Sequence, residues 1–284
     1  DIVLLLGDRY ETHAAATTAM LMNIPIAHIH GGELTEGAVD EQIRHSITKM
    51  SYLHFCSTEA SRQRVIQMGE DQVRVFNSGA PGIDNILNLK LLSKVRLEKE
   101  LNWKLTSKSA LFTYHPVTLE DGDVVSDLEA ILNILTISNL NILFTYANAD
   151  KGGRVINRRL EEFCKTNPLK YKVVKNLGQI RYLSTMKYVD LIIGNSSSGI
   201  IEAASFKKPV VNIGERQKGR LRGVNIIDCD INTLEGSIIV AMSSNFSKKN
   251  KNMKNIYGNG SAANTIVDKL INQPISIVKT FIDK

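Results

Sequence analysis

The chain has 284 residues and a formal net charge of +6, and its length suits one large domain or two of medium size. Hydrophobic residues make up 43% of the chain and charged residues 23%, a composition typical of globular proteins that bury a core without disulfides. Lys and Arg are scattered apart from a run at 248–254, aromatic residues make up 6%, and no apolar run approaches the roughly 18 residues of a membrane span, so neither a nucleic-acid interface nor a membrane segment is expected.

Short apolar runs alternate with helical stretches along the chain. In the first part, strands are predicted at 2–7, 24–29, 53–57 and 73–79, and helices at 11–22, 40–50 and 59–68. After a charged segment, strands are predicted at 109–116, 141–147, 171–177, 190–196 and 209–214, and helices at 124–138, 154–165, 179–187 and 199–206. The strand at 2–7 is apolar throughout, which predicts burial on both faces.

Strands joined by helical crossovers predict parallel sheets, and two such series predict an α/β protein with two Rossmann-like domains facing a cleft. The expected parts are a first domain at 1–88, a connector at 89–107, a nucleotide-binding domain at 108–265 and a C-terminal helix at 266–284. Open parallel sheets bind ligands at the carboxyl ends of their strands. The candidate site segments therefore follow predicted strands: GDR (7–9), HGGE (30–33), HPVT (115–118) and GNSSSG (194–199).

Carboxylates gather in the first two of these segments and just beyond them. Asp8 directly follows the first strand, while Glu33 and Asp40 flank the polar loop after the second. Positioned carboxylates at a ligand-binding edge suit acid–base chemistry. The structural alternatives are that Asp8 caps a helix or pairs with Arg9, and that Asp40 caps the next helix or pairs with Arg44.

Histidines lie among these acids. His28 and His30 alternate along a predicted strand, which would place both rings on one face, and His45 follows in the next helix. A metal site is conceivable there, but no third ligand stands at a familiar spacing, so a core or supporting role is expected for His28 and no metal is expected. The three cysteines, Cys56, Cys164 and Cys229, are widely spaced and odd in number. This pattern favours reduced thiols in a cytoplasmic protein over disulfides.

The segment GNSSSGIIE (194–202) ends a predicted strand and opens a helix. Free N–H groups at a helix start and the serine hydroxyls would bind a phosphate, and Gly199 would let the helix approach the sheet closely. A plain serine cap is the alternative. Glu202 lies about one turn further on, where it suits a ribose diol better than a diphosphate.

Two further segments of the second half carry candidate anion ligands. His115 follows a predicted strand and could reach a phosphate or a leaving-group oxygen, or could be a buried, hydrogen-bonded histidine. After the strand at 209–214, an anion clamp or a solvated loop could be formed by Arg216, Lys218, Arg220 and Arg222. Surface positions are expected for Glu36, Glu41 and Glu215.

At these residues the chain resembles the bacterial hydrolysing UDP-N-acetylglucosamine 2-epimerases of the sialic-acid type. The resemblance rests on GDRYE (7–11), HIHGGE (28–33), DEQIRHSITKMSYLHF (40–55), HPVT (115–118), GNSSSGIIE (194–202), IGERQKGR (213–220) and YGNGSA (257–262). It covers nearly the whole chain and implies a two-domain GT-B fold, usually homodimeric, with no cofactor. It also implies elimination of UDP from UDP-GlcNAc to give 2-acetamidoglucal, followed by hydration to N-acetylmannosamine.

The resemblance also implies roles for individual residues. Asp8, Glu33 and Asp40 match the family's catalytic carboxylates, one of which removes the C2 proton. His115 matches a histidine at the diphosphate. Contacts to UDP are implied for Arg9, Ser196, Ser197, Gly199, Glu202 and Arg216.

Two rival functions share these motifs. One is hydrolysing 2-epimerisation of UDP-N,N'-diacetylbacillosamine, whose sugar pockets cannot be read from the sequence. The other is non-catalytic binding of a sugar nucleotide, for which anion sites alone suffice. Non-hydrolysing epimerases and GT-B glycosyltransferases fit the motifs less well.

The resemblance further predicts that the first domain is incomplete. The family begins with a strand and a GxRxE-type loop that supplies an arginine, and both would precede Asp1. The chain is therefore expected to be an N-terminally truncated form that lacks part of the nucleotide and sugar pocket.

Overall fold

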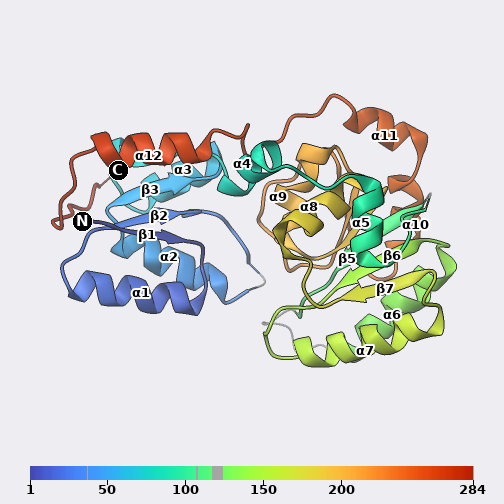
Figure 1. The fold of residues 1–284 in the computed structure, drawn as a ribbon. Coiled ribbons are helices and arrows are strands. Elements are labelled where there is room, and N and C mark those ends of the chain that lie inside the picture. The colour runs from blue at the N-terminus through green and yellow to red at the C-terminus, as the bar shows by residue number, and fades with distance from the viewer. Residues whose placement is uncertain (37, 107, 117–123, 284) are drawn as a thin grey trace. The chain divides into compact units, whose positions relative to one another are not determined.

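The structure is a computed structural model that describes residues 1–36, 38–106, 108–116 and 124–283. It divides into two compact units, each with its own sheet (Figure 1). Unit 1 comprises Asp1–Asn88, Lys218–Arg220 and Ile256–Lys284, and unit 2 comprises Leu89–Gln217 and Leu221–Asn255. Val117 and Thr118 of the HPVT motif lie outside the described residues.

Unit 1 is built on a four-stranded parallel sheet. Its strands run in the order β1 (Val3–Leu6), β2 (Ile26–Ile29), β3 (Leu53–Cys56) and β4 (Val75–Asn77). Figure 1 shows α1 (Tyr10–Leu21) and α2 (Asp40–Met50) on one face and α12 (Ala262–Asn272) on the other. The helix α3 (Glu59–Gln67) packs on Cys56 and Val75. The parallel topology predicted for this part of the chain is thus confirmed.

The strand β1 was predicted to be buried on both faces, but only one of its faces is buried in the structure. Leu5 is buried against α1, but Leu4 and Leu6 are 46% and 57% exposed. These two side chains share the α12 face with their partners Ala27 and Ile29, because paired residues of a parallel sheet point the same way. Within the described residues β1 pairs with β2 alone, and α12 packs over the neighbouring strands rather than over β1.

Unit 2 is built on a six-stranded sheet that is also parallel throughout. Its strands run in the order β10 (Ile226–Cys229), β9 (Val210–Ile213), β8 (Leu191–Gly194), β5 (Ser109–Thr113), β6 (Asn141–Thr145) and β7 (Tyr171–Val174). One face packs on α6 (Val124–Ile137), α7 (Gly153–Thr166) and α10 (Leu234–Ala241). The other face packs on α5 (Lys94–Leu101), α8 (Gly178–Tyr188) and the 3₁₀ helix η2 (Ala203–Phe206). The fold is thus an α/β protein with two parallel sheets, as predicted.

Several elements were not expected from the sequence. The segment treated as a connector contains α5, preceded by α4 (Pro81–Asn88), and β10, α10 and α11 (Ser244–Asn250) follow the last predicted strand. The helix predicted at 199–206 is divided into α9 (Ser197–Ile201) and η2. The 3₁₀ helix η1 (Gln72–Arg74) precedes β4.

The C-terminal helix is shorter than the predicted 266–284. The helix α12 ends at Asn272, and Gln273 is already extended with a ψ of 137°. Pro274 explains the end, because a proline disfavours the helical conformation in the residue before it and has no N–H to continue the ladder. In the described residues, no helix has both the length and the apolar character that a membrane crossing requires.

Candidate functional site

The loop after β2 begins with a change of backbone direction at His30. β2 ends at Ile29, and His30 has a left-handed φ of 70° while its N–H donates to Phe55 O at 2.9 Å. The two rings of the HIH motif therefore do not continue on one strand face as predicted. The ring of His28 is fully buried, with Nδ1 3.1 Å from Thr48 Oγ1 and Nε2 2.8 Å from Gly7 O. Burial lowers the pKa of His28 to about 3, so this histidine is a neutral core group, in line with the supporting role predicted for it.

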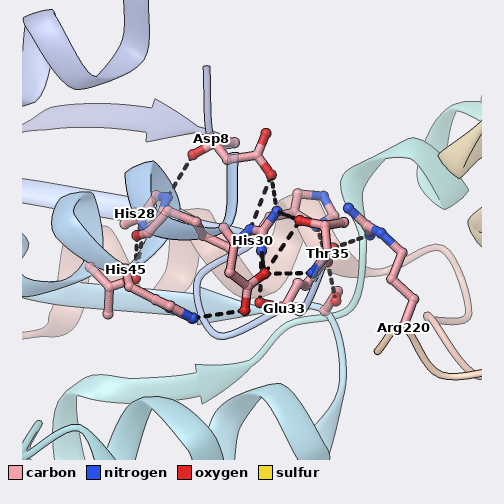
Figure 2. Close-up of polar contacts among 12 residues, drawn as sticks. Asp8, His28, His30, Glu33, Thr35, His45 and Arg220 are labelled. Carbon is pink, nitrogen blue, oxygen red and sulfur yellow. Dashed lines mark hydrogen bonds and ion pairs between the residues drawn. The ribbon is translucent and has the colours of Figure 1, made fainter. Parts of the chain in front are cut away.

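Glu33 is buried and bonded through both carboxylate oxygens. Its Oε1 accepts from His30 Nδ1 at 2.5 Å and from Ser57 Oγ at 2.6 Å, and its Oε2 accepts from Arg220 Nη1 (Figure 2). Burial raises the pKa of Glu33, but its interactions with His30 and Arg220 outweigh burial and hold the pKa well below its usual range. Glu33 is thus a carboxylate that is ionised near neutral pH and accepts from three donors.

Arg44 is fully buried on α2 and links the carboxylates of the network. Its Nε donates to Asp8 Oδ2 at 3.0 Å, its Nη2 donates to the same oxygen, and its Nη1 donates to Glu33 O at 2.8 Å and Glu41 Oε2 at 2.9 Å. Thr35 Oγ1 accepts a further bond from Nη2 at 2.7 Å. A guanidinium can hold several acceptors at once because its donors form a rigid, planar fork. Through Arg44, the structure brings Asp8 and the Glu33 segment into one network.

The start of α2 adds a third acidic side chain, Glu41, to this network. Glu41, expected at the surface, is half-buried and accepts from Arg44, from Thr35 N at 2.5 Å and from His45 Nε2 at 3.1 Å. Burial raises its pKa, yet the bonds from His45, Thr35 and Arg44 lower it to about 2. Asp40 is the first residue of α2, whose N-cap is Val39, so Asp40 does not occupy the capping position considered for it. Among the described residues, no three or more His, Cys, Asp or Glu side chains are arranged to hold a metal ion.

In unit 2 the turn after β8 is held by Asn195. Asn195 Oδ1 accepts from His115 N at 2.7 Å, and Asn195 Nδ2 donates to His115 O at 2.8 Å. His115 Nδ1 accepts from Asn148 N at 3.1 Å. Burial and the nearby Arg216 lower the pKa of His115 to about 4. The ring is therefore neutral near pH 7, and because Nδ1 accepts, its proton lies on Nε2, where it can be donated to an anion.

The serine turn and the loop after β9 meet at the same asparagine. Arg216 Nη1 and Gln217 Nε2 both donate to Asn195 O, at 3.3 and 2.9 Å. Ser196 is the N-cap of α9, and its Oγ accepts from Ser198 N at 3.4 Å, while Ser198 Oγ bonds the hydroxyl of the half-buried Tyr182. Unit 2 thus brings His115, the serine turn and Arg216 together.

Other predicted site residues lie at the edges of these two clusters. Gly199 is buried, and a Cβ there would lie 3.2 Å from Val210 Cγ1, which supports the close packing inferred for it. Glu202 is half-buried at the C-cap of the short helix α9. Arg9 is the N-cap of α1, lies 3.8 Å from Glu11 and stacks over the Tyr10 ring.

The basic run at 216–222 serves three separate purposes. Arg216 bonds Asn195 in unit 2, Arg220 bonds Glu33 within unit 1, and Arg222 Nε bonds both oxygens of Asp228 at 2.9 and 3.0 Å. The sequence predicted an anion clamp or a solvated loop, and it gave no sign that Arg220 would hold a carboxylate.

Two residues of this network, Arg44 and Ser57, are not predicted as site residues from the sequence. A signal for Arg44 existed, because it shares the buried face of α2 with Ile47 and Thr48 at i+3 and i+4. Ser57 directly follows β3, the position at which site residues were sought on the other strands. Glu41 had no comparable signal.

The chain is similar to a known family and to several known proteins. The family described as UDP-N-acetylglucosamine 2-epimerase matches residues 1–271. A hydrolysing GDP/UDP-N,N'-diacetylbacillosamine 2-epimerase of Campylobacter jejuni is 49% identical over 236 residues, which are 83% of this chain and 62% of that protein. Polysialic acid biosynthesis protein P7 of Escherichia coli is 39% identical over 286 residues, which are 99% of this chain and 70% of that protein. The chain thus spans less than two thirds of the Campylobacter protein.

The solved structures agree in fold. A UDP-GlcNAc 2-epimerase from Neisseria meningitidis, solved bound to UDP-GlcNAc, superposes with a TM-score of 0.80 at 20% identity, covering 96% of this chain and 76% of that one. This likeness shows the GT-B type of fold, with two parallel-sheet α/β domains. The family match over most of the chain and the identities of 39% and 49% establish more: the chain belongs to the UDP-N-acetylglucosamine 2-epimerase family.

Proposed function

We propose that the protein is a hydrolysing 2-epimerase of a UDP-linked 2-acetamido sugar. In the first step, UDP is eliminated and a 2-acetamidoglycal forms; in the second, water adds and the free sugar leaves epimerised at C2. The observation that carries the proposal is the buried network at the ends of β1, β2 and β3, where Arg44 and Arg220 hold Asp8 and Glu33 in place.

Removal of the C2 proton requires groups of this kind in the site. The C2 proton of a sugar is only weakly acidic, so its removal needs a positioned base and a stabilised leaving group. Asp8, Glu33 and Asp40 are the proposed acidic groups of the site. Cations placed beside carboxylates fix their ionisation states, which lets groups of one site take different roles.

The proposed nucleotide-binding residues are those at the carboxyl ends of β5, β8 and β9. His115 offers a neutral Nε2–H donor, and Ser196, Ser197 and Arg216 would add donors to a diphosphate. Glu202 would accept from the ribose hydroxyls. Gly199 and Arg9 complete the proposed set.

Two sugars are candidates for the substrate. The Campylobacter relative is named for UDP-N,N'-diacetylbacillosamine, and its 49% identity favours that sugar. The description of the matching family favours UDP-GlcNAc, which would give N-acetylmannosamine. The two sugars differ at C4 and C6. The residues proposed to act at C2 therefore do not distinguish them.

Product analysis with both sugars tests the proposal. The protein is incubated with each UDP-sugar, and released UDP and free 2-epimer are quantified by chromatography. Release of both products from either sugar supports a hydrolysing epimerase, whereas formation of a UDP-linked epimer or no change contradicts it.

A single variant separates catalysis from binding. Asp40→Asn keeps the size of the side chain and removes its charge, so turnover is expected to fall by about 10²-fold or more while the Kd for UDP changes by less than about threefold. Loss of UDP binding by calorimetry would instead make Asp40 a structural residue.

A further inference from the structure

His30 and Glu33 form an oriented pair whose free end is an imidazole nitrogen. An ionised carboxylate can only accept, so the 2.5 Å contact between His30 Nδ1 and Glu33 Oε1 requires the proton to be on Nδ1. If the ring is neutral, Nε2 then carries a lone pair. Within the described residues Nε2 makes no hydrogen bond, and it does not belong to the buried polar atoms that lack a partner, so solvent reaches it. Figure 2 shows the pair within its network.

Both the backbone of His30 and the carboxylate that binds its ring are fixed in place. The backbone N–H of His30 is fixed on β3 through Phe55 O at 2.9 Å, and Glu33 is itself fixed by Arg220 and by Ser57, which directly follows β3. His30 also adopts a left-handed φ of 70°, a conformation that is unfavourable for a non-glycine residue. Strain of this kind persists where the surroundings impose it, and it is typical of functional positions.

The carboxylates of the network are poorly suited to accept a proton. Glu33 is surrounded by three donors and Glu41 by Arg44, His45 and Thr35 N, and each of these contacts stabilises the ionised form. Asp8 Oδ2 accepts from both Nε and Nη2 of the buried Arg44. Glu33 and Glu41, whose pKa values these contacts lower, are poor proton acceptors, whereas Nε2 of His30 meets no hydrogen-bond donor within the described residues.

We infer that His30 Nε2 is the group that takes the C2 proton of the sugar, and that Glu33 is a positioning residue acting through His30. This inference rests on the proposed function. In the elimination step the C2–H bond breaks and its electron pair forms the C1–C2 double bond, while the C1–O bond breaks and its pair leaves with the UDP oxygen. The proton forms a new bond to Nε2, and the resulting imidazolium is stabilised by the Glu33 carboxylate at Nδ1. Water takes that proton before the next turnover.

The first test is the variant His30→Asn. Asparagine tolerates the left-handed conformation better than most residues, so the loop is expected to keep its shape. The kcat for UDP release should fall by about 10²–10⁴-fold, with KM and the Kd for UDP changed by less than about threefold. Added imidazole should restore part of the lost rate. The control His13→Asn removes an imidazole from α1, outside the network, and should leave kcat unchanged.

The second test needs no turnover. In ¹⁵N NMR spectra of the ring nitrogens, His30 of the wild-type protein should carry its proton on Nδ1 and a bare Nε2 at pH 8. In a Glu33→Gln protein whose backbone amide spectrum shows that unit 1 is folded, that preference should be lost, because glutamine no longer demands a donor. A merely structural role of Glu33 would leave the tautomer unchanged.

The outcomes separate this inference from the proposed function. If the wild type converts neither UDP-sugar, the proposed function fails and this inference fails with it. If the wild type is active but His30→Asn keeps kcat within about fivefold, only the assignment of His30 is overturned. A wild-type ring with its proton on Nε2 overturns the assignment as well.

Discussion

At the scale of single residues, the network pairs each buried charge with groups of opposite charge or with hydrogen-bond partners. Arg44 has no exposed surface, yet it serves four acceptors, and each of them compensates part of the cost of burying its charge. Removing one partner of a buried ion pair leaves the other charge uncompensated, which destabilises a protein far more than the pair itself stabilises it.

Arg44→Met is therefore expected to reduce the free energy of unfolding of unit 1 by about 3–5 kcal/mol. The matched control is Arg96→Met, because Arg96 pairs with Glu100 on the surface of α5 with 71% of its side chain exposed. Exposed pairs contribute about 0–1 kcal/mol. Chemical denaturation measures both, and equal effects of the two substitutions would contradict the role given to Arg44.

The buried ionisable groups also predict how stability depends on pH. The pKa of His28 falls from 6.5 to about 3 on burial, so between these values the unfolded state binds more protons than the folded state. Stability from this group is therefore lost as the pH falls from 6.5 toward 3, with a slope of up to about 1.4 kcal/mol per pH unit for one proton. Glu41 and Glu70, with pKa values lowered to about 2, add losses of the same sign below about pH 4.5.

Hydrogen exchange of β2 and β3 amides at several pH values measures this dependence. The variant His28→Gln, which has no titrating group there, should show a shallower slope between pH 6 and 5 than the wild type, by up to about 1.4 kcal/mol per unit. Identical slopes would mean that His28 titrates alike in both states.

At the scale of elements, the loop between β2 and α2 depends on one glycine, Gly32, for its conformation and its packing. Gly32 has a φ of 75°, and a Cβ there would lie 2.3 Å from Ser61 O and 2.7 Å from Val65 Cγ2 of α3. The loop that carries Glu33 can therefore pack on α3 only without a side chain at this position.

Gly32→Ala is expected to destabilise unit 1 by more than the roughly 1–2 kcal/mol of a left-handed alanine, because the clash with α3 adds to it. Gly236 of α10 is the control, since a Cβ there meets nothing within 4 Å and its φ is not positive. Gly236→Ala should raise Tm slightly, as alanine favours a helix by about 0.5–1 kcal/mol over glycine. A Gly32→Ala protein with unchanged Tm would refute the packing argument.

Prediction from the sequence succeeded where apolar periodicity and position after a strand carry the information. The strands from β1 to β9 and the parallel topology follow from runs such as IVLLLG and LIIG separated by helical stretches. It failed for α4 and α5, because their segments are too charged or too short to show a clear period. It also failed for the pairing of Arg220 with Glu33, since 187 residues separate the two and only the folded chain shows the contact.

At the scale of the whole molecule, the burial of an element depends on neighbours that its own sequence does not specify. The apolar run of β1 is typical of an interior strand, but within the described residues β1 pairs with β2 alone, and Leu4 and Leu6 are exposed. The C-terminal segment, in contrast, gains neighbours that are distant in sequence. Far along the chain it returns to unit 1, where Lys279 Nζ donates to Glu70 Oε1 at 2.9 Å and Asp84 accepts the N–H groups of Ala262 and Ala263.

The two units carry different parts of the proposed chemistry. Unit 1 holds Asp8, His30, Glu33 and Asp40, and unit 2 holds His115, Ser196 and Arg216. The central claim of the account is that unit 1 breaks the C2–H bond of a UDP-linked 2-acetamido sugar.

The measurement that tests this claim most directly is proton NMR of the reaction in D₂O with each candidate UDP-sugar. The account predicts UDP and a free 2-epimer that carries deuterium at C2, because the C2 proton passes to the enzyme and solvent supplies its replacement. Release of UDP with a sugar that keeps its original C2 proton and configuration would contradict the account, since it would show simple hydrolysis without C2–H cleavage.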